Sequence, residues 1–198
     1  MTLKENIESF VEPVYTPSKR SNDTYEATTR FVYAELDRLK KMYYESKNDI
    51  QTRRLIRDSI DHHLRRYHGY CIKEKIGAHY REKDLAGKKT VFEHMIPNST
   101  IRDMFIRGAI NSEQACNMPT CLLSDELDKK LKEKGWNSKT PDIFNFWKRY
   151  EYCFEVENAF ETYIGNTVEK GWNLQDHFDL FAKRGWPFEQ DVLLYKYS

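Results

Sequence analysis

The chain has 198 residues, of which 39% are hydrophobic, 14% aromatic and 32% charged, and its formal net charge is +1. This length can bury one sizeable core, and the aromatic content excludes an intrinsically disordered chain. No apolar run approaches the roughly 20 residues that span a bilayer, and the N-terminus lacks the basic-then-apolar pattern of a signal peptide. We therefore expect a cytoplasmic protein with no membrane partner.

The near-neutral total hides an uneven distribution of charge. Residues 38–90 hold 15 Lys and Arg against 7 Asp and Glu, whereas the segments on either side are acidic. A basic block of this kind predicts a surface that contacts a phosphate backbone. It is equally compatible with solvated helix faces whose charge is balanced by the acidic C-terminal part, and both interpretations stay open.

The first segments in chain order predict an N-terminal arm and a basic helical region. Residues 1–21 contain two prolines and a polar cluster, which favour an arm, and residues 22–68 carry helical periodicity. We expect helices at about 22–46 and 48–67, the second with an apolar face formed by Ile56, Ile60, Leu64 and Tyr67. Arginines cover much of the rest of that helix and are candidates for nucleic-acid contacts: Arg53, Arg54, Arg57, Arg65 and Arg66.

Residues 69–150 predict a core that contains strands, and residues 151–198 a helical C-terminal extension. The strand-like stretches are 70–72, 90–96 and 118–123, and the expected short helices are 98–107, 112–116 and 125–134. Thr140 followed by Pro141 predicts the start of a helix that reaches Gly165, and a last helix is expected at 174–184. The prediction is one compact, predominantly helical α+β unit.

The stretch Val91–Pro97 is the most informative because Glu93 and His94 stand side by side within it. A carboxylate beside an imidazole can hold a divalent metal and activate a water molecule. Adjacent residues of a regular strand point to opposite faces, so both reach one site only where the strand bends or bulges. Pro97 favours irregular geometry at this point. The competing interpretation is a pair of ordinary surface residues.

Three segments together resemble a known family of nucleases. Phe92–Pro97, Met118–Asp128 and Phe146–Tyr150, spread over residues 90–150, resemble a divergent phage-type branch of the ββα-metal, or HNH, endonucleases. The resemblance implies a small ββα-metal-like core with helical N- and C-terminal extensions. It also implies a metal-dependent hydrolase that cleaves phosphodiester bonds in DNA, as a phage homing or defence-related nuclease in a bacterial or phage-infected cell.

The same resemblance assigns roles to individual residues. His94 would be the general base, Glu93 a metal ligand and Asn117 the middle asparagine of the pattern. The family's last ligand is a histidine, but none occurs here between His94 and His177, so a carboxylate of Glu126 or Asp128 would replace it. Magnesium or manganese suits such oxygen ligands.

A structural zinc site is not expected from the cysteines. Cys116 and Cys121 have four residues between them, at the edge of zinc-ligand spacing, while Cys71 and Cys153 lie far away in sequence. Four free, mostly buried thiols are the expectation, which suits a reducing compartment.

Two other functions remain open at this point. One is a non-catalytic regulator that binds nucleic acid through the basic block. The other is a phage inhibitor of host defence that binds a protein through its aromatic-rich, acidic C-terminal region. The same region is the candidate surface for a homodimer or another protein partner.

Overall fold

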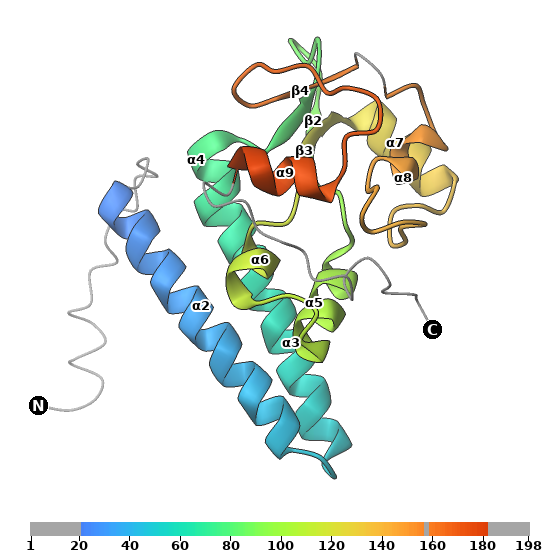
Figure 1. The fold of residues 1–198 in the computed structure, drawn as a ribbon. Coiled ribbons are helices and arrows are strands. Elements are labelled where there is room, and N and C mark those ends of the chain that lie inside the picture. The colour runs from blue at the N-terminus through green and yellow to red at the C-terminus, as the bar shows by residue number, and fades with distance from the viewer. Residues whose placement is uncertain (1–20, 157–158, 182–198) are drawn as a thin grey trace, which may run out of the picture.

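An antiparallel helical hairpin forms the N-terminal part of the structure and extends away from the sheet (Figure 1). The computed structural model describes residues 21–156 and 159–181, so all but the last residue of the arm expected at 1–21, and the chain after 181, lie outside the described residues. The hairpin consists of α2 (Asn22–Glu45) and α3 (Ile50–Tyr67). The side chains of Ser21 and Asp49 accept hydrogen bonds from backbone amides in the first turns, which fixes where the two helices begin. Both expected helices are confirmed.

The apolar face predicted for α3 is also confirmed, because its four residues Ile56, Ile60, Leu64 and Tyr67 are all buried. On α2 the buried residues are Tyr25, Val32, Leu36 and Leu39. Phe31, which lies next to this stripe, keeps half of its surface exposed. The hairpin therefore packs along one narrow face of each helix.

The chain continues from α3 as a helix and does not turn into a strand. A π-helix, η1 (His68–Lys73), follows directly and leads into the short α4 (Glu74–Ile76), which ends at Gly77 with φ +82°. The prediction of a strand at 70–72 was therefore wrong. Cys71 and Ile72 are buried, as a strand would bury them, but they extend the helical core. A short apolar run cannot distinguish the two structures.

Four short strands form one mixed sheet in the order β2-β3-β1-β4. Their bounds are β1 (Tyr80–Glu82), β2 (Thr90–His94), β3 (Thr120–Ser124) and β4 (Phe160–Thr162). Strand β3 is antiparallel to β2 and parallel to β1, and β4 is antiparallel to β1. The strands expected at 90–96 and 118–123 correspond to β2 and β3. Strands β1 and β4 were not predicted, because three residues are too few to show alternation.

The remaining helices surround this sheet and the inner half of the hairpin. They are α5 (Asn98–Arg107), α6 (Ser112–Cys116), α7 (Asp125–Glu133), α8 (Lys148–Glu151) and α9 (Leu174–Phe181). Helix α7 follows β3 directly, begins where the Ser124 hydroxyl accepts a hydrogen bond from the Leu127 amide, and contacts both β2 and β3. The chain is thus mostly helical and of the α+β class, as predicted.

The long helix expected from Pro141 to Gly165 was wrong. The Asp142 carboxylate accepts hydrogen bonds from the backbone and side chain of Asn145 and from Lys148, which stabilises a local turn. Only the four residues of α8 follow as a helix, and β4 lies in the region predicted to be helical.

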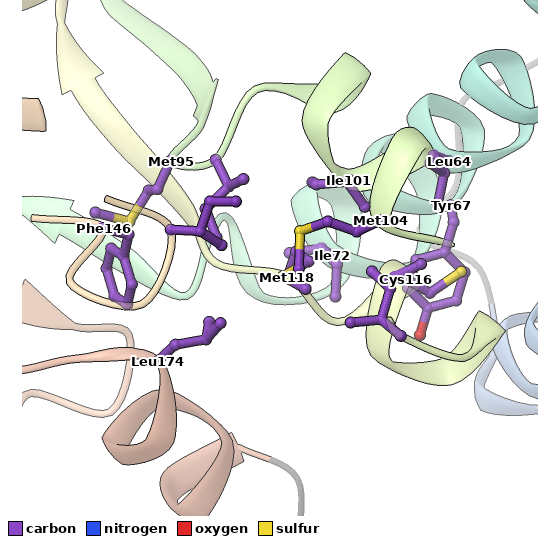
Figure 2. Close-up of a cluster of buried hydrophobic side chains, with 14 of the residues drawn as sticks. Leu64, Tyr67, Ile72, Met95, Ile101, Met104, Cys116, Met118, Phe146 and Leu174 are labelled. Atoms are coloured by element: carbon purple, nitrogen blue, oxygen red, sulfur yellow. The ribbon is translucent and has the colours of Figure 1, made fainter. Parts of the chain in front are cut away.

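The hydrophobic core runs continuously from the hairpin to the sheet. Figure 2 shows Leu64 and Tyr67 of α3 at one end, Met104 and Met118 in the middle, and Phe146 near the other end. All four cysteines are free and three of them are buried. No helix within the described ranges is long and apolar enough to cross a membrane.

A buried chain of hydrogen bonds connects α9 to the sheet. The indole Nε1 of Trp172 and the Tyr80 hydroxyl are 3.0 Å apart, Tyr80 lies 3.0 Å from Nδ1 of His177, and Nε2 of His177 lies 2.8 Å from the carbonyl oxygen of Asn117. Because a carbonyl only accepts, Nε2 of His177 carries the proton. Tyr80 therefore donates to Nδ1 and accepts from Trp172, so every bond in the chain has a defined direction.

The substitution Tyr80→Phe is expected to lower the free energy of unfolding by about 1–3 kcal/mol, because it leaves the buried ring of His177 and the partly buried indole of Trp172 without a partner. Urea unfolding measures the change. Tyr163→Phe is the matched control, since Tyr163 is 39% exposed and should shift the free energy by less than about 0.5 kcal/mol. Equal effects of the two substitutions would contradict the assignment of these bonds.

Candidate functional site

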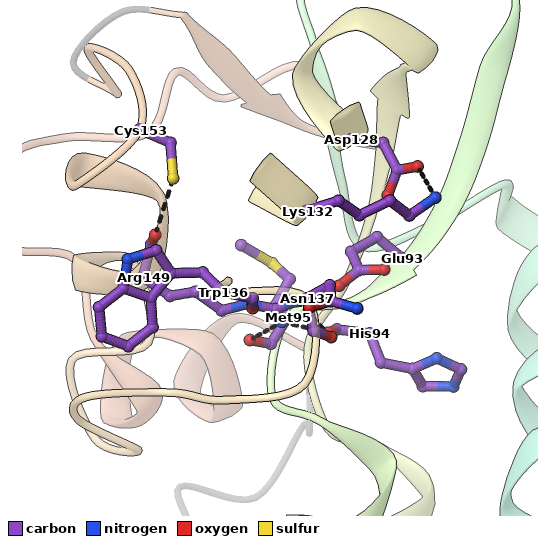
Figure 3. A network of polar contacts seen from close by, with 9 residues as sticks. All are labelled: Glu93, His94, Met95, Asp128, Lys132, Trp136, Asn137, Arg149 and Cys153. Carbon is purple, nitrogen blue, oxygen red and sulfur yellow. Dashed lines mark hydrogen bonds and ion pairs between the residues drawn. The ribbon is translucent and has the colours of Figure 1, made fainter. Parts of the chain in front are cut away.

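The side chains of Glu93 and His94 lie on opposite faces of β2. The strand pairs regularly with β3, placing Glu93 opposite Cys121 and His94 opposite Thr120 without a bulge. Figure 3 shows the His94 ring directed away from the Glu93 carboxylate. The bend that would bring both groups to one point is absent from this strand, because Pro97 comes after the strand and immediately before α5.

Arg149 of α8 binds the Glu93 carboxylate in the interior. Its guanidinium is fully buried and forms an ion pair with Glu93 through Nη2. It also donates hydrogen bonds of 2.6–3.1 Å to four backbone carbonyl groups, those of His94, Met95, Trp136 and Asn137 (Figure 3). One side chain thereby connects α8, the end of β2 and the loop after α7.

Asp128 lies near Glu93 but also has a cationic partner. This residue of α7 is buried, and its Oδ2 lies 2.6 Å from Nζ of Lys132 (Figure 3). The pKa of Glu93 is raised above its usual value, mainly because the carboxyl group is buried. The charge of Arg149 lowers this pKa, and the charge of Asp128 raises it. The positive charge that a metal would bring between these carboxylates is already supplied by Arg149 and Lys132.

The other expected ligands lie elsewhere. The Glu126 side chain is 74% exposed and pairs with Lys130 at 2.9 Å. Asn117, after α6, donates through Nδ2 to the Tyr33 hydroxyl at 3.0 Å and to the Glu113 carbonyl at 2.8 Å.

Of the five residues expected to form the site, three as metal ligands and two as catalytic residues, the structure therefore brings together only Glu93 and Asp128. In the described part of the chain, no group of three or more His, Cys, Asp or Glu residues is arranged to hold a metal ion. The residues present do not fit the metal centre that the sequence resemblance implies.

His94 faces the π-helix and contacts a second histidine. Its Nε2 lies 2.9 Å from Nδ1 of His68, and the ring centroids are 4.7 Å apart in an edge-on arrangement. His68 is fully buried, whereas His94 is partly exposed. Phe92 lies on the same face of β2, with its ring centroid 5.7 Å from that of His94. The sequence did not identify this pair, because the two residues are 26 positions apart and no local motif joins them.

Both histidines of the pair are uncharged at neutral pH. Burial lowers the pKa of His94 to about 4, and the positive charges of Arg65 and Arg149 add to the effect. Burial also lowers the pKa of His68 well below its usual value, and His94 contributes in the same direction. One neutral ring therefore donates the hydrogen bond and the other accepts it.

The second ring nitrogen of His94, Nδ1, is not fully buried. No described residue forms a hydrogen bond with its Nδ1, and this atom is not among the buried polar atoms that lack a partner in the described structure. His94 thus presents one nitrogen to the interior and one to the surface.

Exposed cations lie on the two helical elements next to His94. Arg65, Arg66 and Lys73, which we call the basic stripe, are exposed on α3 and η1. The Arg66 guanidinium lies 5.8 Å from the centre of the Tyr70 ring, and Lys73 Nζ lies 5.8 Å from that of Phe92. No ion pair among the described residues involves a member of the stripe.

The five arginines predicted to bind nucleic acid fall into two groups. Arg54 is exposed and lies eleven positions before Arg65, which is about three turns along the same helix face. Arg57, in contrast, pairs with Asp103 at 2.9 Å, and Arg53 stacks on Tyr43 at 4.1 Å. Three of the five arginines, Arg54, Arg65 and Arg66, are therefore available to a ligand.

No family model, curated protein or solved structure matches this chain significantly. Its function is therefore inferred from the arrangement of its own residues.

The substitution Arg149→Met is expected to lower the free energy of unfolding by about 3–5 kcal/mol, because it leaves the buried Glu93 carboxylate and four carbonyl groups without their donor. Lys130→Met is the control. Lys130 also pairs with a carboxylate, that of Glu126, but the two side chains are 45% and 74% exposed, so the expected loss is below about 1 kcal/mol. Chemical denaturation of both variants checks the difference, and similar losses would refute the role of Arg149.

Acidification is expected to destabilise the protein before most carboxylates titrate. The pKa of both His94 and His177 is lowered to about 4 by burial, whereas an unfolded histidine titrates near 6.5. The unfolded state binds more protons between these values, so stability is complete above about pH 6.5 and falls as the pH drops toward 4. The loss at pH 5 is about 2 kcal/mol per histidine. Equal unfolding midpoints at pH 7 and pH 5 would contradict this expectation.

Proposed function

We propose that this protein binds nucleic acid, DNA in the first instance, and cleaves its phosphodiester bonds beside His94. The observation that carries the proposal is a neutral, partly exposed histidine, with one ring nitrogen free of described partners, close to the basic stripe. A nuclease needs cations to bind phosphates and a base to activate the attacking water. Both kinds of group occur together on this face.

The composition of the face favours a polyanionic ligand. Arg65, Arg66 and Lys73 have no acidic partner among the described residues, so their charge is available to phosphate groups. Tyr70 and Phe92 are partly exposed beside these cations. Aromatic rings interleaved with basic residues are typical of surfaces that stack bases while they hold the backbone.

The proposed chemistry uses His94 as the general base. A neutral imidazole takes a proton from a water molecule as the water oxygen attacks phosphorus, and the bond from phosphorus to the leaving oxygen breaks. The leaving oxygen takes a proton from solvent. Arg65 and Lys73 stabilise the charge that develops on the phosphoryl oxygens.

The proposal assigns no step to a metal held by the protein, because Glu93 and Asp128 are bound by cations and lie on the other face of β2. Magnesium often binds mainly through water and substrate phosphates. The assays therefore compare its presence with its removal by a chelator.

A second candidate function is nucleic-acid binding without cleavage. It is supported by the same basic stripe and aromatic neighbours, and it does not require the open nitrogen of His94. The two candidates differ in one observable, the breaking of a phosphodiester bond.

Binding is expected to depend on the stripe. Reversing its three charges (Arg65→Glu, Arg66→Glu and Lys73→Glu together) should weaken binding to duplex DNA by more than about 100-fold at low salt. It should also reduce the slope of log affinity against log salt concentration by the amount that about three phosphate contacts contribute. The matched control reverses three exposed lysines outside the stripe: Lys134, Lys139 and Lys170. Fluorescence anisotropy over a range of salt concentrations measures both quantities. Equal weakening in the two triple variants would refute a specific binding face.

Cleavage is expected to depend on His94. Plasmid DNA is incubated with the wild type, His94→Gln and the control His62→Gln, which changes an exposed histidine of α3, with Mg²⁺ or Mn²⁺ and with a chelator. Loss of a general base lowers the rate by about 10²–10⁴-fold, while binding and the unfolding midpoint should change little. Binding with no cleavage by the wild type would favour the second candidate, and neither binding nor cleavage would overturn both.

A further inference from the structure

We propose that His68 is a positioning residue that holds His94 with Nε2 turned inward and Nδ1 turned outward, so that Nδ1 is the nitrogen that takes the proton. This inference rests on the proposed function for its catalytic part. Its structural part concerns which nitrogen of His94 carries a hydrogen, and that can be measured without any activity.

The geometry gives His94 a single partner in the interior. The 2.9 Å contact between Nε2 of His94 and Nδ1 of His68 is its only side-chain hydrogen bond within the described residues. His68 is fully buried and its ring packs edge-on against His94. A buried ring has little freedom to turn, so the direction of its Nδ1 sets the orientation of the more exposed ring.

The backbone at this point is unusual and fixes where His68 lies. His68 is the first residue of η1, which replaces the α-helical pattern at the end of α3. Single π-helical turns inside α-helices occur frequently at functional sites. Here the π-helical segment spans the stretch from His68 to Lys73, so the buried histidine and a cation of the basic stripe belong to one turn structure.

The hydrogen bond between two neutral rings has two possible directions, and the proposed function requires one of them. If His94 donates through Nε2–H, its Nδ1 has a free lone pair and can act as a base. If His68 donates, Nδ1 of His94 carries the hydrogen and cannot. The inference is therefore that Nδ1 of His68 is the acceptor in the 2.9 Å contact.

The experiment reads the tautomer directly. Long-range ¹H–¹⁵N correlation spectra of the full-length, ¹⁵N-labelled protein at pH 7 distinguish a protonated from an unprotonated ring nitrogen. The expected result is a protonated Nε2 and an unprotonated Nδ1 on His94. A protonated Nδ1 on His94 in the wild type would overturn the inference, whether or not the protein cleaves DNA.

Two substitutions of His68 separate positioning from packing. In His68→Asn the side-chain oxygen can replace Nδ1 as an acceptor, whereas His68→Leu fills similar space without one. The His94 tautomer should be preserved in the Asn variant and become mixed in the Leu variant. The plasmid cleavage rate should fall by about 10–100-fold in the Leu variant, as for other groups that orient a reactive side chain, and recover to within about threefold in the Asn variant.

Equal spectra and equal rates in the two variants would refute a positioning role. If the wild type has the expected tautomer but cleaves no phosphodiester bond, the proposed function fails and the catalytic part of this inference fails with it, while the assignment of the hydrogen bond stands. If the Leu variant does not fold, the wild-type and Asn spectra still decide the tautomer.

Discussion

The arrangement around β2 depends on one buried cation. The Arg149 guanidinium has left water completely, which is costly unless its charge and its donors are all matched inside the protein. Glu93 supplies the opposite charge and four carbonyl groups supply acceptors. Because those groups come from the end of β2 and from the loop after α7, satisfying Arg149 also fixes the path of both segments. The direction of the His94 side chain, on the opposite face, follows from that fixed strand.

The ion pair with Arg149 gives Glu93 a structural role that is separate from the role of His94. Side by side in the sequence, Glu93 and His94 suggested one site with two functions. In the fold their side chains lie on opposite faces of β2. The carboxylate pairs with a buried cation, and the imidazole lies near the surface, close to an aromatic ring and to basic residues. The alternation of a regular strand is sufficient to separate them.

The sequence predicted those elements that depend on interactions between residues close together in the chain, and it missed those that depend on residues far apart. Helices α2, α3 and α7 were predictable because their caps and apolar stripes lie within a few residues of one another, as with Ser124 and the first turn of α7. The fold class followed from the same local patterns. The π-helix was not predictable, because Tyr70, Cys71 and Ile72 are as apolar as a strand and only the preceding helix decides their geometry. The site was not predictable for a related reason: His68 and Arg149 are brought to β2 by packing. No sequence motif includes His68, and the resemblance of Phe146–Tyr150 assigns no role to Arg149.

Asn117, which the family resemblance marks as a candidate catalytic residue, has a structural role in the fold. Its side chain binds Tyr33 of α2, and its carbonyl accepts the hydrogen of His177 in α9. A single residue near the middle of the chain therefore joins the first described helix to the last. Two hydrogen bonds thus connect α9 with the hairpin directly, without involving a residue of the sheet.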